Sequence, residues 1–275
     1  MNNYNSSKRI SYGKNVKIGE NVKFIGEITI KDNVKISDNV IIYPNVKIKD
    51  SSFIGRGCII GEPTADYYHK DDHIFKPTII GKGSIIRSGT IIYENNVLGD
   101  ELQTGHNTII REGSKIGNKC SIGTLTELQP YVNIGNYVRI HSKVMVGELT
   151  RVEDFVWIYP HVIITNDRYP PMGDLKGVTI RKYAQIGAGS LILPGIEIGE
   201  NAIVGTMTMV KRDVKPERVI SGVPGRDICS IRDLKSDKGE YIYPWKEHLK
   251  EYKGYPWQKK NNKFKDWYAH IFILF

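Results

Sequence analysis

The sequence has few cysteines and no long apolar run, and each shortage excludes a class of protein. Its 275 residues contain only Cys58, Cys120 and Cys229, an odd number with no close pair. A disulfide-stapled scaffold is therefore excluded, and reduced thiols fit the cytoplasm. The polar N-terminal stretch has no signal-peptide core, and the apolar run at 271–275 is too short to span a bilayer. We expect a cytoplasmic protein that does not cross a membrane.

The net charge is +9, from 39 Lys and Arg against 30 Asp and Glu. A basic chain can bind nucleic acid, but here the lysines are scattered through short turn-like strings and form no stripe. We therefore expect no nucleic-acid partner. The positive balance favours anionic small molecules, such as nucleotides.

The chain does have a six-residue repeat. An apolar residue returns at every sixth position in the runs 18–60, 80–164 and 180–210, and only Thr104 departs from this rule among 29 positions. Neither the helical period of 3.6 nor the strand period of 2 explains the spacing. A smaller residue, such as Cys58 or Cys120, occupies the position two before each apolar one. Both side chains point the same way from a strand, so together they fill one narrow interior.

Turn-forming residues occupy the rest of each hexapeptide. Glycine follows the apolar residue in 13 of the 29 cases, and asparagine recurs close by, as at Asn21 and Asn118. Both residue types tolerate the positive φ of tight turns. Each hexapeptide is thus one flat side and one corner, and three of them make a coil of 18 residues. The pattern predicts an all-β parallel solenoid of about ten coils, on the order of 45–50 Å tall.

Two segments interrupt the repeat, at 61–78 and 165–177. Counting hexapeptides in threes places both at the same corner, about five coils apart. A long loop on a regular scaffold is either functional or packs on its own or a neighbouring subunit. We expect two domains, a solenoid over 1–225 and a partly helical C-terminal extension over 226–275. Capping, partner contact and substrate contact all remain open for that extension.

The closing coils, AQIGAGSLILPGIEIGENAIVGTMTMVKRDV followed by SGVPGRDI, resemble those of the hexapeptide-repeat acyltransferases. Members of that family fold as a left-handed parallel β-helix and use acyl-CoA, whereas the general rule for parallel crossovers would favour the right hand. The strings IIRSGTIIYENNVLGDELQTGHNTIIRE and ITNDRYPP are most similar to dTDP-3-amino-3,6-dideoxyhexose N-acetyltransferases. The resemblance implies acetyl-CoA as co-substrate, no metal, and a homotrimer with its sites between subunits.

The matched positions imply four catalytic residues: His141, Glu148, Asn166 and Asp167. His141 takes a corner position where glycine is usual, so its side chain should project outward. Glu148 and Asn166 are 18 residues apart and should stack one coil apart, with Asp167 opening the second loop beside them. His141 follows a different side, so an adjacent subunit would have to bring the groups together. His106 is the rival base, and a corner histidine with a turn-capping Asn-Asp pair is the purely structural alternative.

Small residues at one corner leave room for the pantetheine arm of CoA, at Gly187, Ala188, Gly189 and Gly205. Basic residues are placed to meet the CoA phosphates, at Lys211, Arg212, Lys215, Arg218 and Arg226. Residues on neighbouring coils are candidates for the nucleotide, at Arg87, Tyr93, His106, Asn107 and Arg111. Corners also need small residues for structural reasons, and the charged residues also fit an ordinary solvated surface.

We therefore expect an acetyl-CoA-dependent N-acetyltransferase in which the amine of a dTDP-linked 3-amino-3,6-dideoxyhexose attacks the thioester directly. A protein base or the departing thiolate then takes the proton. The alternatives are a UDP-linked or 4-amino sugar, a hydroxyl acceptor, or a solenoid that binds without catalysis. A metal-dependent hydratase needs three converging histidines, and the spacings of His106, His141 and His161 do not stack.

Overall fold

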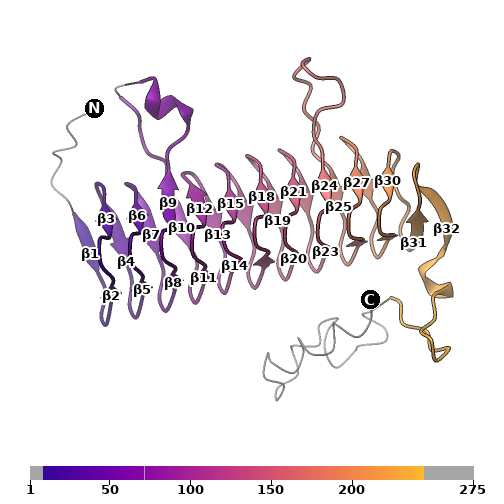
Figure 1. The fold of residues 1–275 in the computed structure, drawn as a ribbon, viewed down its shortest axis with the longest axis horizontal. Helices are drawn as coiled ribbons and strands as arrows, with labels where there is room; N and C mark the ends of the chain where they lie inside the picture. The colour runs from indigo at the N-terminus through magenta and orange to yellow at the C-terminus, as the bar shows by residue number, and fades with distance from the viewer. Residues whose placement is uncertain (1–8, 71, 245–275) are drawn as a thin grey trace.

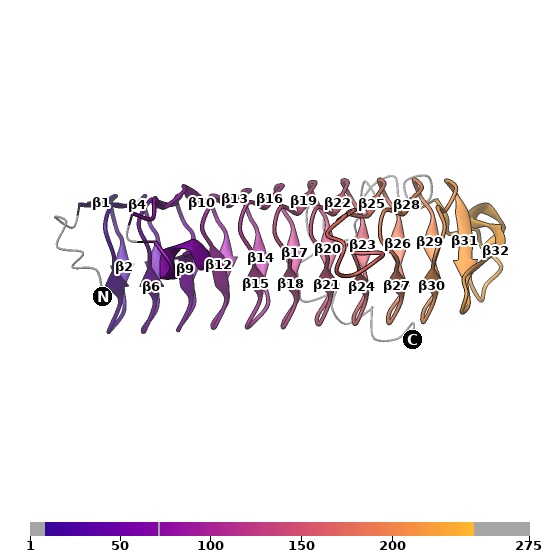
Figure 2. The same ribbon diagram turned by 90° about the horizontal axis from the view of Figure 1, so that it is seen from above.

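The computed structural model describes residues 9–70 and 72–244, which form a three-sided prism of stacked coils (Figures 1 and 2). Sheet A has ten strands: β1 (Ile10–Tyr12), β4 (Ile28–Ile30), β7 (Val46–Ile48), β10 (Thr78–Ile80), β13 (Val97–Leu98), β16 (Lys115–Ile116), β19 (Asn133–Ile134), β22 (Arg151–Val152), β25 (Thr179–Ile180) and β28 (Glu197–Ile198). Sheet B has twelve: β2 (Lys17–Ile18), β5 (Lys35–Ile36), β8 (Phe53–Ile54), β11 (Ile85–Ile86), β14 (Gln103–Thr104), β17 (Ser121–Ile122), β20 (Arg139–Ile140), β23 (Trp157–Ile158), β26 (Gln185–Ile186), β29 (Ile203–Val204), β31 (Arg218–Ser221) and β32 (Arg226–Ser230). Sheet C has ten: β3 (Lys23–Phe24), β6 (Ile41–Ile42), β9 (Ile59–Glu62), β12 (Ile91–Tyr93), β15 (Ile109–Ile110), β18 (Glu127–Leu128), β21 (Met145–Val146), β24 (Ile163–Ile164), β27 (Leu191–Ile192) and β30 (Met209–Val210).

Each coil contributes one strand to sheets A, B and C in turn, and successive strands of a sheet pair in parallel. Between the loops the partners are 18 residues apart, as for Ile116 and Ile134. The expected left-handed parallel β-helix is confirmed. Sheet B extends beyond the ten expected coils, because β31 adds a parallel strand and β32 returns antiparallel to it. The β32 hairpin covers the strand edge that would otherwise end sheet B.

The repeating apolar residues form the core. From Ile30 to Val210 all of them are at most 4% exposed, whereas Ile18, at the open N-terminal end of the prism, is 40% exposed. Cys58 and Cys120 are buried free thiols, as predicted. Burial raises the pKa of Cys58 to about 11 and that of Cys120 to about 12, so both are neutral core residues.

The exception in the repeat, Thr104, is buried with its hydroxyl satisfied. Its Oγ1 accepts a hydrogen bond from the backbone N–H of Arg87 at 2.9 Å and lies 3.2 Å from the hydroxyl of Thr90. The Arg87 side chain donates to the Thr104 carbonyl at 2.6 Å. A polar residue is tolerated inside the prism here because its bonds replace those it would make to water.

At the corners, the residue with the positive φ and the residue whose side chain bonds the neighbouring coil are two different positions. The positive φ falls on the third residue after the apolar one, which is Asn21 in one coil (φ 54°) and Lys119 in another (φ 57°). Asn118, one position earlier, was expected to supply the positive φ and does not. Its side-chain oxygen instead accepts the N–H of Asp100 at 2.8 Å, which ties one coil to the next.

We name the three edges of the prism by the sheets that they join, AB, BC and CA. Both long loops leave edge CA, the first between β9 and β10 and the second between β24 and β25, and Figure 1 shows them projecting from the same side. The predicted common corner and the separation of five coils are confirmed. The first loop contains the short 3₁₀ helix η1 (Ala65–Tyr68).

After β32 the described chain contains the 3₁₀ helix η2 (Ile231–Asp233) and a bridge between Lys235 and Tyr241. The extension was expected to be partly helical, and in its described part, up to residue 244, η2 is the helical element; the rest lies outside the described residues. The proposed domain boundary at 225 falls between β31 and β32 and stays a prediction. No helix within 9–70 or 72–244 has the length and apolarity to cross a bilayer.

Candidate functional site

From β11 onward, edge BC gathers one residue from each coil at the end of the sheet B strand. In chain order they are Arg87, Gly105, Gly123, His141, Tyr159, Gly187, Gly205 and Ser221. Backbone hydrogen bonds fix this order, since the N–H of His141 donates to Ile158 O and that of Tyr159 to Ile186 O. The predicted catalytic histidine therefore shares an edge with the glycine corner at 187–189. They are two coils apart, roughly 10 Å at the usual strand spacing.

His141 does leave the core, as expected, but its ring lies against the next coil. It stacks on Tyr159 with 5.2 Å between ring centroids and 15° between planes, and Trp157 lies 6.4 Å away. Its Nε2 is buried and has no hydrogen-bond partner among the described residues. Burial, and then the charge of Arg139, lower the pKa of His141 to about 4. The imidazole is therefore neutral at pH 7 and can accept a hydrogen bond or a proton.

Edge CA holds the other predicted catalytic residues. The N–H of Gly147 donates to Ile164 O at 2.8 Å, and a methyl group on Gly147 would lie 3.2 Å from Cβ of Asn166. Glu148 and Asn166 therefore stack on adjacent coils, as the 18-residue spacing predicted. Neither side chain is hydrogen-bonded to another described residue, so both are available to a ligand. Asp167 accepts the N–H of Tyr169 at 3.0 Å, which is the turn-capping arrangement.

Sheet C lies between these two groups in a single chain. His141 follows β20 on one side of it, and Glu148 follows β21 on the other side. One subunit thus holds the catalytic candidates on two separate edges, as expected from the sequence.

The glycine corner has a structural reason for its small residues. A Cβ on Gly187 would lie 2.6 Å from the Gly205 carbonyl carbon, and one on Gly205 would lie 2.9 Å from the Ser221 hydroxyl. Gly189 has a φ of +69°. Coil stacking therefore favours glycine at 187 and 205 whether or not a ligand binds, whereas His161 and Met207 adopt the same positive φ as Gly189 on neighbouring coils. Ala188 is half-buried.

The predicted phosphate-binding residues are spread over the end of the prism. Lys211 and Arg212 are exposed on edge CA after β30, and Lys215 is exposed further on. Arg226 pairs with Ser221 and so lies at edge BC, near the glycine corner. Arg218 already holds Asp227, with Nε 2.9 Å from Oδ1 and 3.0 Å from Oδ2. Arg226 is thus the best placed of the five for a ligand on edge BC.

The nucleotide candidates divide between two edges. Arg87, His106 and Asn107 lie on edge BC. Tyr93 and Arg111 lie on edge CA, where the guanidinium carbon of Arg111 is 4.7 Å from the Tyr93 ring centroid. Arg111 also holds Glu112, at 2.8 Å from Nε to Oε2. The five residues do not form one cluster within a single chain.

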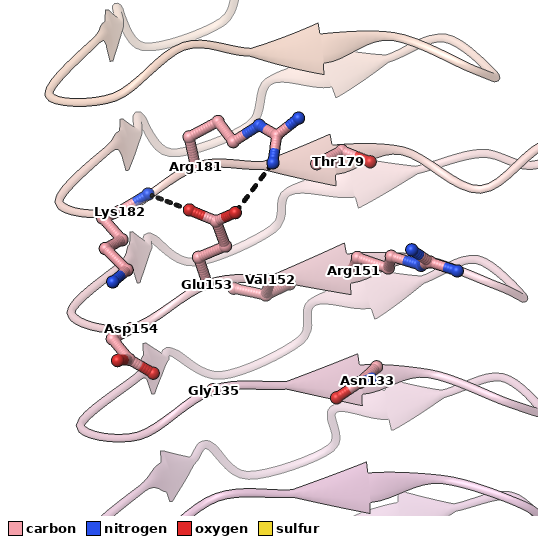
Figure 3. A pocket seen from close by; sticks show the side chains of 9 residues that line it. All are labelled: Asn133, Gly135, Arg151, Val152, Glu153, Asp154, Thr179, Arg181 and Lys182. Atoms are coloured by element: carbon pink, nitrogen blue, oxygen red, sulfur yellow. Dashed lines mark hydrogen bonds and ion pairs between the residues drawn. The ribbon is translucent and has the colours of Figure 1, made fainter.

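A shallow cleft of about 360 Å³ opens on the outer face of sheet A near edge AB (Figure 3). Its residues are Asn133, Gly135, Arg151, Val152, Glu153, Asp154, Thr179, Arg181 and Lys182. One carboxylate organises it, since Glu153 accepts Arg181 Nη1 at 2.8 Å and the N–H of Lys182 at 3.0 Å. Arg181 also holds Glu197 at 2.7 Å, and this hydrogen bond lowers the pKa of that carboxyl group. None of the predicted site residues lines this cleft.

The sequence interpretation missed two residues that shape the candidate sites. Tyr159 lies 18 residues after His141, so the coil length alone could have identified it as the ring's neighbour. Glu94 is 2% exposed and binds the first loop, accepting the N–H of Lys76 at 2.8 Å and lying 2.9 Å from His73 Nε2. No short-range sequence signal marks Glu94 as the loop anchor.

Residues 177–212 match the family model of the bacterial transferase hexapeptide (six repeats). The six-residue repeat of this segment is thus the pattern that the family model describes. Within its residues 9–70 and 72–244, no group of three or more His, Cys, Asp or Glu side chains is placed to hold a metal ion.

Two curated proteins are similar to parts of this hexapeptide-repeat chain. A putative serine acetyltransferase of Schizosaccharomyces pombe is 35% identical over 88 residues, covering 32% of each chain. The galactoside O-acetyltransferase of Escherichia coli K12 is 27% identical over 124 residues, covering 42% of this chain and 60% of the relative. The matches thus span about a third and three fifths of these relatives. The solved UDP-N-acetylglucosamine acyltransferase of Arabidopsis aligns at 15% identity and a TM-score of 0.43, over 80% of this chain and 72% of that one.

Proposed function

We propose that the chain is an acetyl-CoA-dependent acetyltransferase. The observation that carries the proposal is edge BC, where a neutral histidine lies two coils from a glycine-lined corner. The names of both curated relatives describe acetyl transfer, which supports the same reaction class. In this proposal the pantetheine arm of CoA lies along edge BC beside 187–189, and Arg226 meets its phosphates.

The proposed acceptor is the amine of a dTDP-linked 3-amino-3,6-dideoxyhexose, supported by the resemblance of the middle coils. The amine nitrogen attacks the thioester carbonyl, a C–N bond forms, and the C–S bond breaks to release the CoA thiolate. The amine proton passes to the thiolate, giving free CoA thiol. A histidine with a pKa near 4 is a weak base at neutral pH. We therefore assign His141 to orienting the amine by accepting its hydrogen bond, with Glu148 and Asn166 holding the sugar.

The proposed active unit is a homotrimer, supported by the outer surface of sheet C, here called face C. Its outward residues are mostly aliphatic: Ile41, Ile59, Ile91, Ile109, Met145, Ile163, Leu191 and Met209. Met145 is 36% and Ile163 43% exposed in the single chain. Burial of such a surface drives association. With face C turned toward a threefold axis, edge BC of one subunit meets edge CA of the next, which unites His141 with Glu148 and Asn166.

A second candidate is O-acetyl transfer, favoured by the similarity to the galactoside O-acetyltransferase. The same edge would then present a sugar hydroxyl to the thioester. A hydroxyl keeps its proton at neutral pH, so this reaction depends more strongly on a protein base than amine transfer does.

The deciding experiment offers acetyl-CoA with a panel of acceptors and follows free thiol. The panel holds dTDP- and UDP-linked 3-amino and 4-amino sugars, a galactoside and serine. We expect thiol release with the dTDP-linked 3-amino sugar. Release only with the galactoside supports the second candidate, and release with none of the acceptors contradicts both.

Two substitutions test the edge CA residues. Glu148→Gln and Asn166→Ala should each lower turnover at least about tenfold, since each removes a contact to the acceptor, and leave the trimer intact. Asn133→Ala, an exposed polar change on the outer face of sheet A, is the matched control. Unchanged turnover in both variants contradicts the assignment.

Subunit mixing tests whether two chains share a site. Separately inactive His141→Ala and Asp167→Ala trimers should regain part of the activity after their subunits exchange, because some sites then carry both native residues. No recovery, with exchange confirmed by mass, means that each chain works alone.

A further inference from the structure

One coil of the prism, residues 115–131, has a large side chain at each of its three corners. Lys119 lies on edge AB, Leu125 on edge BC and Tyr131 on edge CA, at the same corner position, with φ of 57°, 56° and 58°. Large side chains are disfavoured in this left-handed conformation. The two apolar ones are also open to solvent, with Leu125 53% and Tyr131 50% exposed. Backbone strain of this kind points to a role in function.

Edges BC and CA change character together at this coil. At the same corner position, the earlier coils have residues that suit a positive φ. They are Asn21, Asn39, Gly57, Gly89 and Asn107 on edge BC, and Asn45, Asn95 and Gly113 on edge CA. Asparagine and glycine are the residues that this conformation favours. Leu125 and Tyr131 thus depart from the local preference on the same coil and on both edges.

Leu125 lies between two residues of edge BC that are candidates for binding the acceptor. Its N–H donates to the carbonyl oxygen of His106, on the preceding coil, at 2.9 Å. The hydroxyl of the next residue, Thr126, donates to the carbonyl oxygen of His141, on the following coil, at 2.8 Å. His106 is a candidate for the nucleotide, and His141 is proposed to orient the amine. Leu125 is therefore about 4.8 Å along the prism from each of these two coils.

Tyr131 has the equivalent place on edge CA. Its N–H donates to the carbonyl oxygen of Glu112, the residue after Arg111, at 2.9 Å. On the other side, the residue after Glu148 donates its N–H to the carbonyl oxygen of Pro130 at 3.3 Å. Tyr131 thus lies one coil from a nucleotide candidate and one coil from a residue proposed to hold the sugar.

The preceding coil supports the Tyr131 ring. A Cβ on Gly113 would lie 2.4 Å from Cδ1 and 2.5 Å from Cε1 of Tyr131, so glycine at 113 leaves room for this ring position. The residue lies on edge CA between the two long loops, which leave the prism at β9 and β24 (Figure 1). One edge of the ring therefore rests against the coil, while the exposed part of the side chain can contact a ligand.

We propose that Leu125 of one subunit and Tyr131 of the partner subunit form an apolar clamp for the acceptor sugar, and that this clamp selects a 6-deoxy sugar. In the proposed trimer edge BC meets edge CA of the next subunit, and with the threefold axis along the prism the same coil of each lies at the same height. The sugar ring then lies at the clamp, because it joins the amine at His141 and Glu148 to the diphosphate on the preceding coils.

The selectivity follows from the chemistry at C6 of the sugar. A methyl group there can be buried against leucine and tyrosine side chains, whereas a hydroxymethyl group would lose hydrogen bonds to water without replacing them. The inference rests on the proposed acetyl transfer and trimer, and it adds the residues that determine which sugar is accepted.

The test compares kcat/KM for two acceptors that differ only at C6, a dTDP-linked 3-amino-3,6-dideoxyhexose and its 6-hydroxy counterpart, each with acetyl-CoA. The native protein should prefer the 6-deoxy sugar about tenfold or more. Leu125→Asn and Tyr131→Asn introduce the residue that suits this backbone conformation, so both variants should fold. Each should lower the preference at least about threefold, because the amide can hydrogen-bond the C6 hydroxyl.

Two further variants serve as controls. Lys119→Asn is the same change on edge AB of the same coil, away from the clamp, and should keep the native preference. Tyr131→Phe keeps the ring and should also keep it; a lost preference there would assign the discrimination to the hydroxyl and overturn an apolar clamp. For a variant that binds without turnover, the dissociation constants of the two sugars, measured by calorimetry, give the same ratio.

The outcomes separate this inference from the proposed function. Thiol release with an unchanged 6-deoxy preference in both asparagine variants overturns the clamp and leaves acetyl transfer standing. An altered preference for thymine over uracil, with the sugar preference unchanged, assigns the two residues to the base and also overturns the clamp. Thiol release with no acceptor overturns the proposed function and the clamp with it.

Discussion

Replacing Glu94 with glutamine should release the first loop from the prism while the coils stay folded. The Glu94 carboxylate follows β12, is 2% exposed, and binds both ends of the loop. Oε1 accepts the N–H of Thr64 at 3.2 Å and its hydroxyl at 3.3 Å and lies 2.9 Å from His73 Nε2, while Oε2 accepts the N–H of Lys76 at 2.8 Å. Glutamine offers one oxygen, so an N–H donor on one side would face its NH₂ group.

The magnitude follows from the bonds lost. A hydrogen bond to a charged group contributes about 1.5–3 kcal/mol, and Glu94→Gln removes at least one of them. The loss of about 2 kcal/mol of local stability corresponds to an opening constant about 30-fold larger. The aromatic contacts of Phe75 with Tyr43 and Tyr67, at centroid distances of 5.9 and 5.7 Å, remain and should limit the change.

Amide hydrogen exchange measures this opening directly. Protection of the Thr64 and Lys76 amides should fall about 30-fold, while that of the Arg139 amide, bonded to Val156 in the coils, should not change. Glu112→Gln, which alters a half-buried carboxylate outside the loop, is the matched control. Unchanged protection at Thr64 and Lys76 would refute the reasoning, and an equal loss at Arg139 would show that Glu94 stabilises the whole prism.

Three further predictions concern the coils. Gly187→Ala places a methyl group 2.6 Å from the Gly205 carbonyl carbon and should destabilise the chain by about 1–3 kcal/mol in denaturant unfolding; an unchanged midpoint contradicts this. Thr104→Val leaves the N–H of Arg87 without its side-chain acceptor and should lower the free energy of unfolding by about 1–3 kcal/mol in the same assay. A negligible change would mean that water replaces the hydroxyl. The folded pKa of His141, about 4, lies below the ordinary 6.5, so the unfolded chain binds the proton first and stability should fall as pH drops from about 6.5 to about 4. The loss is up to about 3 kcal/mol, and His141→Phe should remove this part of the pH dependence of unfolding.

The sequence predicts the coils because their rule is local. One apolar residue every six positions, such as Ile116 and Ile122, determines the side, the interior and the 18-residue register. The same counting located both loops on one edge and stacked Glu148 over Asn166. It could also have paired His141 with Tyr159, since both follow sheet B strands.

What the sequence could not predict depends on side chains that reach across the repeat. Arg218 was expected to face phosphate but holds Asp227, because the antiparallel return of β32 brings that carboxylate beside it. Asn118 was expected to make the turn and bonds the neighbouring coil instead. Such pairings follow from loop and hairpin geometry that no hexapeptide encodes.

The regular pitch of the prism sets the axial distance between residues on different coils of the same edge. Insertion or removal of 18 residues at an edge between His106 and His141 would change the distance between them by one increment of about 4.8 Å and leave both side chains on edge BC. An insertion of another length at a corner can loop outward, as 61–78 and 165–177 do, and then leaves the spacing of the coils unchanged. The axial distance between the proposed CoA-binding coils and the coils that would bind the far end of an acceptor can therefore change only in steps of one coil.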